Sequence, residues 1–327
     1  MTNCLLADVG GTWARFALLS GSKMEPIHPL AVGAYGSAVH AIKHFLHGEA
    51  KGARIDSAVI AGAGPVVAGR CALTNSTWVL DTEELRRTFG LRTVNIVNDL
   101  EALAWAIPHL TPTDSEPIGR GNEVASEPIA VVAPGTGLGM ACLMPMQGGG
   151  RVLASEGGHA TLAATTAREA AIIDILRKRY GHVSAERALS GHGLMNLHAA
   201  IAELDGNSGE APSAEDITRA AIEGSSGARE TLDAFCSFLG AVSGDAALMF
   251  GARGGVYLAG GIVPRIVDYL RRTNFRAQFE SKGRLRDYLR HIPTRVIVRP
   301  DPTFVGLRTL ADARLIGDGP RPGTRTP

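Results

Sequence analysis

The chain has 327 residues, of which 45% are hydrophobic and 20% charged, and its 33 basic residues nearly balance its 32 acidic ones. The composition is that of a globular protein, and the length corresponds to about two domains. The net charge of +1 argues against a protein that binds nucleic acid or a membrane surface, because either partner requires an excess of basic residues. Glycine is unusually frequent, at 40 residues, which favours tight turns and backbone that approaches a ligand closely.

The four cysteines, Cys4, Cys71, Cys142 and Cys236, are too widely spaced for a metal-ligand or disulfide framework. We expect buried, reduced thiols. The first eight residues lack the basic region of a signal peptide, and no apolar run approaches the ~20 residues of a membrane helix. These features predict a cytoplasmic protein without a membrane partner.

The first third of the chain alternates apolar runs with glycine turns and helical segments. Strands are predicted at Cys4–Ala7, Phe16–Leu19, Ser57–Gly62 and Val94–Val97, and helices at Thr82–Phe89 and Glu101–Ile107, the latter stopped by Pro108. The stretch Thr111–Pro128 is rich in Pro, Gly, Ser and Asn. We expect it to be a domain boundary and a surface loop.

The first two predicted strands flank a turn that contains the pair Gly11-Thr12. A second strand–turn–strand unit, Ile129–Met144, contains the pair Gly135-Thr136 about one domain length later. This repetition indicates a duplicated or paired architecture. Beyond the second unit, helices are predicted at Ala167–Tyr180, around Leu194–Leu204, after a capping box at Ser213, and at Thr231–Phe250. Strands follow at Gly254–Ala259 and Thr294–Val298, with Pro264 in the first turn of one helix and Asp301-Pro302 beginning the last. The tail Gly317–Pro327 is expected to be disordered.

Three glycine turns are the main chemical clue: Gly10-Gly11-Thr12, Gly135 to Gly139, and Gly260-Gly261. Successive backbone N–H groups in such turns converge on one point and bind anions. The chain has no P-loop, and Gly137-Leu138-Gly139 leads into a strand rather than the helix of a dinucleotide fingerprint. A plain hairpin fits each single turn as well.

Asp8 follows the apolar run of the first predicted strand, just before the Gly10-Gly11-Thr12 turn. A carboxylate there would repel a phosphate unless a cation intervened, so one hypothesis is a magnesium-associated group acting through water. An aspartate bonded to its own turn is the alternative.

Asn98 and Asp99 follow another strand, where ligands bind in open α/β sheets. Asp99 is a candidate general base, and a helix N-cap is the alternative. Glu156, His159 and Glu186 offer carboxylate and imidazole groups that suit sugar hydroxyls. A zinc site or ordinary loop polarity also fits them.

Several stretches together resemble a known family. Asp8 to Thr12 with Arg15, Gly135 to Gly139, and Leu258 to Ile262 are similar to the phosphate-1, phosphate-2 and adenosine motifs of the sugar kinase/actin/Hsp70 superfamily. The chain from about residue 4 to about residue 308 resembles the bacterial ATP-dependent glucokinase family. The supporting stretches are Leu73–Trp78, Val97–Asp99, Glu156–His159, Gly181–Arg187, Leu189–Gly191 and Ala259–Arg265.

The resemblance implies an α/β fold of two ribonuclease-H-like (actin-like ATPase) domains with mixed sheets flanked by helices and the active site in the interdomain cleft. The small domain would be residues 1–109 plus 300–318, the large domain 110–299, and residues 319–327 a tail. Asp99 would be the catalytic base. The resemblance implies sugar binding by Asn75, Asn98, Asp99, Glu156, His159 and Glu186, and binding of ATP and Mg²⁺ by Asp8, Gly10, Gly11, Thr12, Gly135, Thr136, Gly137, Gly139, Gly260 and Gly261, with Asp8 reaching the metal through water.

The activity implied is transfer of the γ-phosphoryl group of ATP to the 6-hydroxyl of glucose, the first step of glycolysis, by a cytoplasmic homodimer. A kinase for another hexose, a non-catalytic or regulatory sugar-binding protein, and an actin-like or chaperone-like ATPase remain as alternatives. Glu156, His159 and Glu186 favour a sugar kinase, because an ATPase has no need of a second polar pocket. Trp13 departs from the family pattern, in which many relatives carry Asn, and Pro134 removes one N–H before the second phosphate turn.

Overall fold

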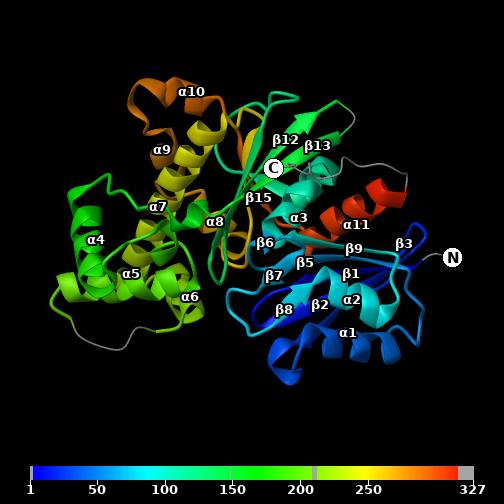
Figure 1. Ribbon diagram of the computed structural model, residues 1–327. Helices are drawn as coiled ribbons and strands as arrows, with labels where there is room; N and C mark the ends of the chain where they lie inside the picture. The colour runs from blue at the N-terminus through cyan, green and yellow to red at the C-terminus, as the bar shows by residue number, and fades with distance from the viewer. Residues whose placement is uncertain (1–2, 148, 208–211, 316–327) are drawn as a thin grey trace, which may run out of the picture. The chain divides into compact units, whose positions relative to one another are not determined.

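The computed structural model describes residues 3–147, 149–207 and 212–315. The chain divides into two compact units (Figure 1). Unit 1 contains the residues up to Leu110 together with those from Pro300 onward, and unit 2 is Thr111–Arg299. Each unit is built around one large mixed sheet. The predicted tail Gly317–Pro327 lies outside the described residues.

The main sheet of unit 1 has the strand order β3-β2-β1-β5-β9, with β4 paired to β2. Strands β1, β5 and β9 are parallel, whereas β1–β2 and β2–β3 are antiparallel. The bounds are β1 Asn3–Val9, β2 Trp13–Ser20, β3 Lys23–Met24, β4 His28–Ala31, β5 Ser57–Gly62 and β9 Thr93–Asn98. A small antiparallel sheet, β6 Val66–Val67, β7 Arg70–Ala72 and β8 Val79–Asp81, lies between β5 and β9 in the sequence.

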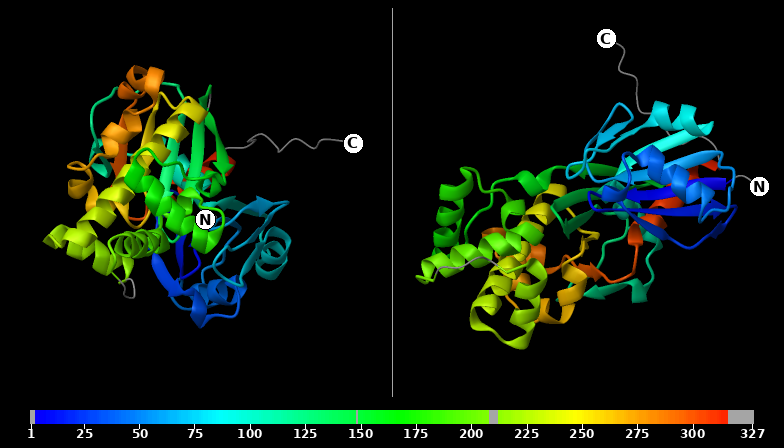
Figure 2. Two further views of the ribbon diagram at one scale, coloured as in Figure 1. Left: turned by 90° about the vertical axis from the view of Figure 1, so that its left-hand side faces the viewer. Right: turned by 90° about the horizontal axis from the view of Figure 1, so that it is seen from below.

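Both faces of the unit 1 sheet are covered by helices, because side chains alternate along each strand. In β1, Leu5 belongs to a core cluster that includes Phe45 of α1, and Leu6 belongs to one that includes Phe304 of α11. The helices of this unit are α1 Ala38–His47, α2 Thr82–Phe89, α3 Asp99–Ala106 and α11 Pro302–Leu315, with 3₁₀ turns at Val32–Ala34 and Ile107–His109. Figure 2 shows α11, in red, along the blue N-terminal strands.

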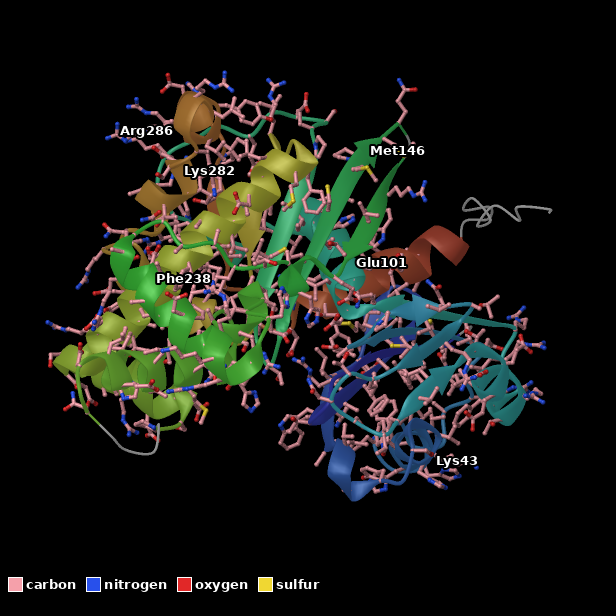
Figure 3. The ribbon with its side chains drawn as sticks, turned by 60° about the vertical axis from the view of Figure 1, so that its left-hand side comes forward. Lys43, Glu101, Met146, Phe238, Lys282 and Arg286 are labelled. Atoms are coloured by element: carbon pink, nitrogen blue, oxygen red, sulfur yellow. The ribbon has the colours of Figure 1, made fainter. Side chains whose placement is uncertain are left out.

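The sheet of unit 2 has the order β10-β15-β14-β11-β12-β13. Strands β11, β14 and β15 are parallel, and β10, β12 and β13 pair antiparallel with their neighbours. The bounds are β10 Ser115–Pro117, β11 Ile129–Pro134, β12 Leu138–Met146, β13 Gly149–Ser155, β14 Gly255–Leu258 and β15 Thr294–Ile297. Met146, labelled in Figure 3, ends β12 and is exposed.

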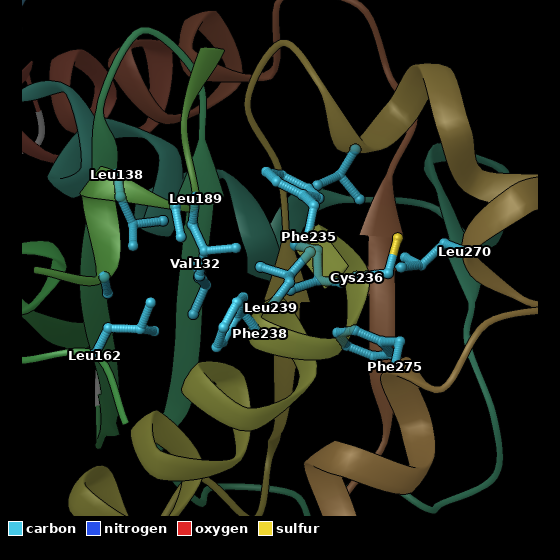
Figure 4. Close-up of a cluster of buried hydrophobic side chains, with 14 of the residues drawn as sticks. Val132, Leu138, Leu162, Leu189, Phe235, Cys236, Phe238, Leu239, Leu270 and Phe275 are labelled. Atoms are coloured by element: carbon cyan, nitrogen blue, oxygen red, sulfur yellow. The ribbon is translucent and has the colours of Figure 1, made fainter. Parts of the chain in front are cut away.

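Helix α7, Ser226–Phe250, is the centre of the unit 2 core. Its Phe235 and Phe238 pack in one buried cluster with Val132 of β11 and Phe275 of α9 (Figure 4). The other helices are α4 Ala167–Tyr180, α5 Gly191–Leu204, α6 Ala214–Glu223, α8 Val267–Leu270, α9 Phe275–Glu280 and α10 Arg286–Arg290, with 3₁₀ turns at Pro112–Asp114, Gly157–His159, Ala185–Arg187, Val263–Ile266 and Gly283–Leu285.

The two sheets share one topology, which confirms the duplicated architecture predicted from the Gly-Thr pairs. Each has a three-stranded antiparallel meander, β1 to β3 or β11 to β13, followed by two strands added parallel to the first, β5 and β9 or β14 and β15. In both, the first hairpin turn is the Gly-Thr turn.

Most predicted elements are confirmed, some residue for residue, as for β5, α2 and α4. Two expectations are wrong in part. Thr111–Pro128 is not a plain loop, because it contains the edge strand β10. Helix α7 begins at Ser226 rather than Thr231. Pro264 lies in the first turn of a helix, as expected, and that helix is the 3₁₀ segment Val263–Ile266 leading into α8. The four cysteines are free and buried, as expected.

Within the described ranges, α7 is the one helix long and apolar enough to cross a membrane, although no such run was expected. Of its most apolar window, 61% is buried inside the protein. A core helix of a folded unit has the same length and composition, and α7 packs as one.

Candidate functional site

The parallel strands of unit 1 end together. Val9, Gly62 and Asn98 occupy one row across β1, β5 and β9. The Gly10–Thr12 turn and Asp99 follow directly after this row. The sequence therefore places the phosphate-1 candidates and the catalytic candidate at the carboxyl edge of one sheet, where α/β proteins bind ligands.

The Gly10–Thr12 turn is held by its own backbone and by Asn75. Gly10 N–H donates to the Trp13 carbonyl over 2.9 Å. A Cβ on Gly11 would lie 2.8 Å from both the Cβ and the carbonyl oxygen of Asn75, so a glycine is needed there. The structure thus brings Asn75, predicted to bind sugar, against a predicted phosphate turn. Thr12 and Trp13 are exposed.

Asp8 forms an ion-pair network that sequence reasoning missed. Its Oδ2 lies 2.8 Å from Nη2 of Arg15, and Nη1 of Arg15 lies 2.6 Å from Oδ1 of Asp301, at the start of α11. Burial raises the pKa of Asp8, and the charge of Arg15 opposes that rise. The Asp301-Pro302 pair had indicated a helix start, but nothing in the sequence links a residue near the C-terminus to β1.

Asn98 and Asp99 open α3. Asn98 is the N-cap, since its Oδ1 accepts a hydrogen bond from Leu100 N–H at 3.0 Å, and its Nδ2 donates to the Gly64 carbonyl at 3.1 Å. Asp99 is the first helical residue, and its Oδ1 also accepts from Leu100 N–H, at 2.9 Å. The N-cap role considered as the alternative for Asp99 thus belongs to its neighbour Asn98. Asp99 therefore lies in the first turn of α3, at the end of the helix where its unpaired backbone N–H groups gather.

Asp99 also acts on a neighbouring thiol. Burial, together with the charge of Asp99, raises the pKa of Cys71 to about 11. Cys71 Sγ lies 3.5 Å from the Gly64 carbonyl, the same group that Asn98 contacts. The surroundings of Asp99 therefore include a thiol that stays protonated, and so uncharged, near neutral pH.

In unit 2 the corresponding strand ends carry the other two glycine turns. Gly135 N–H donates to the Gly137 carbonyl at 2.8 Å, which closes a tight turn, and Thr136 at its tip is exposed. Gly260 has a φ of +86°, and a Cβ there would lie 2.2 Å from the Pro134 carbonyl oxygen. The phosphate-2 and adenosine motifs are thus in direct backbone contact.

Gly139 departs from its expected place. It lies inside β12, where it pairs with Ala133, rather than in the turn. The turn consists of Gly135, Thr136 and Gly137, because Pro134 and Leu138 already pair as strand residues. The N–H groups available to an anion are accordingly fewer than the glycine pattern suggested.

The sugar candidates of unit 2 lie on two short 3₁₀ segments joined to each other. Ala185 N–H donates to the Ala160 carbonyl at 2.9 Å, and Thr161 and Ser184 form a β-bridge. Glu156 and His159 are exposed, with 4.0 Å between Oε2 and Nε2. Glu186 is half-buried, and its Oε2 accepts a hydrogen bond from Leu138 N–H at 2.9 Å.

The zinc alternative for Glu156 and His159 gains no support. Within the described part of the chain, no group of three or more His, Cys, Asp and Glu side chains is arranged to hold a metal ion.

Comparison with known proteins identifies the family. A family model for glucokinase matches residues 5–314. The glucokinase of Paramagnetospirillum magneticum is 43% identical over 310 residues, which cover 94% of this chain and 96% of that protein. This chain belongs to the glucokinase family. It is therefore a sugar kinase, a phosphotransferase, as the resemblance implied.

Structural similarity agrees with the sequence. The crystal structure of glucokinase from an Antarctic psychrotroph has a TM-score of 0.84 and 34% identity, with 96% of this chain and 99% of that one covered. A ROK-family glucokinase from Streptomyces griseus, solved with glucose and AMPPNP, has a TM-score of 0.67 at 19% identity and shows the shared fold alone. The actin-like ATPase fold expected from the resemblance is thus confirmed.

Proposed function

We propose that the protein transfers the γ-phosphoryl group of ATP to the 6-hydroxyl of glucose, giving glucose 6-phosphate and ADP, the first step of glycolysis. Family membership over residues 5–314 carries this proposal. The residues at the sheet edges fit it, with a carboxylate at a helix start, two Gly-Thr turns, and polar side chains on two short segments.

Asp99 is the catalytic base of the proposed reaction. A sugar hydroxyl is a weak nucleophile while protonated, and Asp99 accepts that proton as the phosphoryl group is transferred. The carboxylate is held between a strand end and a helix N-terminus, and rigid elements keep catalytic groups in the productive geometry. Backbone N–H groups of the Gly10–Thr12 and Gly135–Gly137 turns would stabilise the charge on the transferred group, with the exception of the Gly10 and Gly135 N–H groups, which are bonded within their own turns.

Asp8 would hold Mg²⁺ through a water molecule. Its Oδ2 is paired with Arg15, so the metal-bound water would have to contact its other carboxylate oxygen, Oδ1. Mg²⁺ keeps most of its waters and is usually bound by one or two carboxylates plus substrate phosphates, so a single carboxylate fits this ion. Mg²⁺ would supply neutralising charge on the phosphates.

Glucose would be bound by its hydroxyls. Glu156 and Glu186 accept hydrogen bonds from them, His159 and the Asn98 amide can donate as well as accept, and Asn75 lies against the phosphate turn. Charged acceptors form the stronger hydrogen bonds, so the two glutamates would contribute most of the sugar affinity.

The decisive experiment is Asp99→Asn. Asparagine keeps the size and one acceptor oxygen but cannot take a proton. General-base catalysis contributes about 10²–10⁴ in rate, so kcat should fall at least about 100-fold while glucose binds within about tenfold. The measurement is steady-state kinetics with a coupled ADP assay, together with glucose affinity by calorimetry. Near-normal turnover would leave Asp99 as a helix-start residue without a role as base.

The same assay with a panel of hexoses tests the substrate. Turnover with another hexose in place of glucose would reassign the acceptor, and sugar binding without turnover would favour a regulatory sugar-binding protein. We also propose a cytoplasmic homodimer, as the family resemblance implies. Light scattering after size-exclusion chromatography would measure a mass of about twice 34.3 kDa.

A further inference from the structure

Gly137 lies in the phosphate-2 turn but touches a sugar candidate. A Cβ placed on Gly137 would lie 2.4 Å from Oε2 and 3.3 Å from Cδ of Glu186. The same Oε2 accepts the hydrogen bond from Leu138 N–H. The Glu186 carboxylate therefore occupies the space that a side chain at position 137 would fill.

Hydrogen bonds and shared apolar packing also connect the Gly135–Gly137 turn with the segment around Glu186. Gly191 N–H, at the start of α5, donates to the Gly135 carbonyl at 2.9 Å. Ser190 Oγ donates to the Glu186 carbonyl at 3.0 Å. Leu138 and Leu189 share the buried cluster shown in Figure 4. Because the backbone is anchored on both sides, Glu186 cannot move away as a rigid segment to make room for a larger residue 137.

The second sugar segment rests on the same residue. A Cβ on Gly158 would lie 2.0 Å from the Leu138 carbonyl oxygen. The N–H of Leu138 thus holds Glu186, and its carbonyl lies against the segment that carries Glu156 and His159. Leu138, the residue that follows the phosphate turn, therefore contacts Glu186 and also the segment that carries Glu156 and His159.

We propose that Gly137 is a positioning residue for the acceptor sugar. The missing side chain lets Glu186 reach Leu138 N–H with Oε2, which fixes the direction of the carboxylate and leaves Oε1 for a sugar hydroxyl. A larger residue at position 137 should therefore weaken sugar binding, although the motif assigns this turn to phosphate. This inference rests on the proposed role of Glu186 as a hexose ligand.

The turn supplies its own matched control. At Gly135 the nearest atom to an added Cβ is Gly261 N, 3.9 Å away, which is ordinary contact. Neither Gly135 nor Gly137 has a φ in the left-handed range, so alanine is compatible with the backbone at both. Gly137→Ala and Gly135→Ala therefore add the same methyl group to the same turn, and only the first displaces Glu186.

The test is glucose affinity by calorimetry, without nucleotide. A hydrogen bond to a charged group is worth about 10- to 150-fold in affinity, so Gly137→Ala should weaken glucose binding at least about tenfold. Gly135→Ala should leave it within about threefold. Equal effects of the two variants, or unchanged glucose affinity in Gly137→Ala, would overturn the inference.

A double-mutant cycle with Glu186→Ala shows whether Gly137→Ala acts through Glu186. In the Glu186→Ala background the methyl group meets no carboxylate, so Gly137→Ala should change glucose affinity no further. Additive losses would overturn the inference. If Glu186→Ala alone leaves glucose affinity unchanged, the failure lies instead in the proposed hexose role of Glu186.

Discussion

Asn98 uses both ends of its amide, which gives it a structural role beside the proposed sugar contact. Its oxygen caps α3 and its nitrogen holds the Gly64 carbonyl. Removing a capping side chain costs about 0.5–2 kcal/mol. We expect Asn98→Ala to raise the KM for glucose with a smaller effect on kcat, and also to lower the melting temperature.

Asn98→Ser is the control for that prediction. Serine keeps an acceptor for Leu100 N–H but lacks the amide N–H that donates to the Gly64 carbonyl, so it should retain the cap and lose the second contact. Its melting temperature should lie between those of the wild type and Asn98→Ala in a thermal scan. An unchanged melting temperature in Asn98→Ala would show that the cap contributes nothing measurable.

At the residue scale, the sequence placed Asp8, Asn98 and Asp99 at strand ends because local signals suffice for that: an apolar run, a polar pair, then a helical pattern. It did not predict that Asp8 pairs with Arg15 and through it with Asp301. Asp301 reaches Arg15 because α11 packs on the sheet. A local sequence pattern cannot predict a contact between residues so far apart in the chain.

At the scale of elements, Gly306 fixes the contact between α11 and α3. A Cβ there would lie 1.7 Å from the Ala102 carbonyl oxygen. Glycine to alanine within a helix normally stabilises by about 0.5–1 kcal/mol, but this methyl group would meet backbone that cannot give way. Gly306→Ala should instead destabilise by about 1–3 kcal/mol, as overpacked sites do.

Gly227 in α7 provides the comparison, because an added Cβ there meets nothing within 4 Å. Urea unfolding should give a lower midpoint for Gly306→Ala and an equal or higher midpoint for Gly227→Ala. A stabilised Gly306→Ala would mean that α11 and α3 separate easily.

The contact of His198 with Thr231, between α5 and α7, should make the free energy of unfolding depend on pH. His198 of α5 lies 3.0 Å, Nδ1 to Oγ1, from Thr231 of α7, and Thr231 donates its own proton to the Gly227 carbonyl. Burial lowers the pKa of His198 from its ordinary 6.5. The unfolded chain therefore binds this proton more readily, so the contribution is present above pH 6.5 and lost as the pH falls through the folded pKa.

His198→Asn should flatten this dependence between about pH 7 and pH 5, since asparagine does not titrate. His192→Asn, at an exposed site on the same helix, should leave it unchanged. Melting temperatures over that range measure both variants, and an identical slope in wild type and His198→Asn would contradict the assignment.

Element boundaries were predictable where local signals agree. Helix α4 begins with a capping box at Thr166 and ends at Gly181, and both signals stand in the sequence. Strand β10 was missed because Pro117 and the surrounding polar residues look like a loop, and it is only as an edge strand that such a segment pairs. The start of α7 was missed because Ser225 to Gly227 resembles a turn, while tertiary packing of Ala228 extends the helix.

At the scale of the whole molecule, the duplicated topology was predictable because the repeated Gly-Thr turn marks the same point in each sheet. Local sequence patterns did not predict which separate segments of the chain supply residues to the proposed site. Asn75, Asn98 and Asp99 belong to unit 1, and Glu156, His159 and Glu186 to unit 2. Only the family resemblance assigned them to one ligand, because sequence spacing does not record which distant segments share a substrate.

Glucose binding should stabilise the whole fold without nucleotide. A ligand that binds only the folded state adds RT ln(1 + [L]/Kd), about 2.7 kcal/mol at 100 times Kd, and for a chain of this size that corresponds to a rise of several degrees in melting temperature. The rise should grow with the logarithm of the glucose concentration.

Glu156→Gln should reduce the rise in melting temperature, because an amide accepts a hydrogen bond less strongly than a carboxylate does. Glu156 is exposed in the free protein, so this variant should melt like the wild type when no sugar is present, which separates lost binding from lost folding. A protein whose melting ignores glucose but responds to another hexose would have a different acceptor. One that responds to no sugar would contradict the hexose role of these residues.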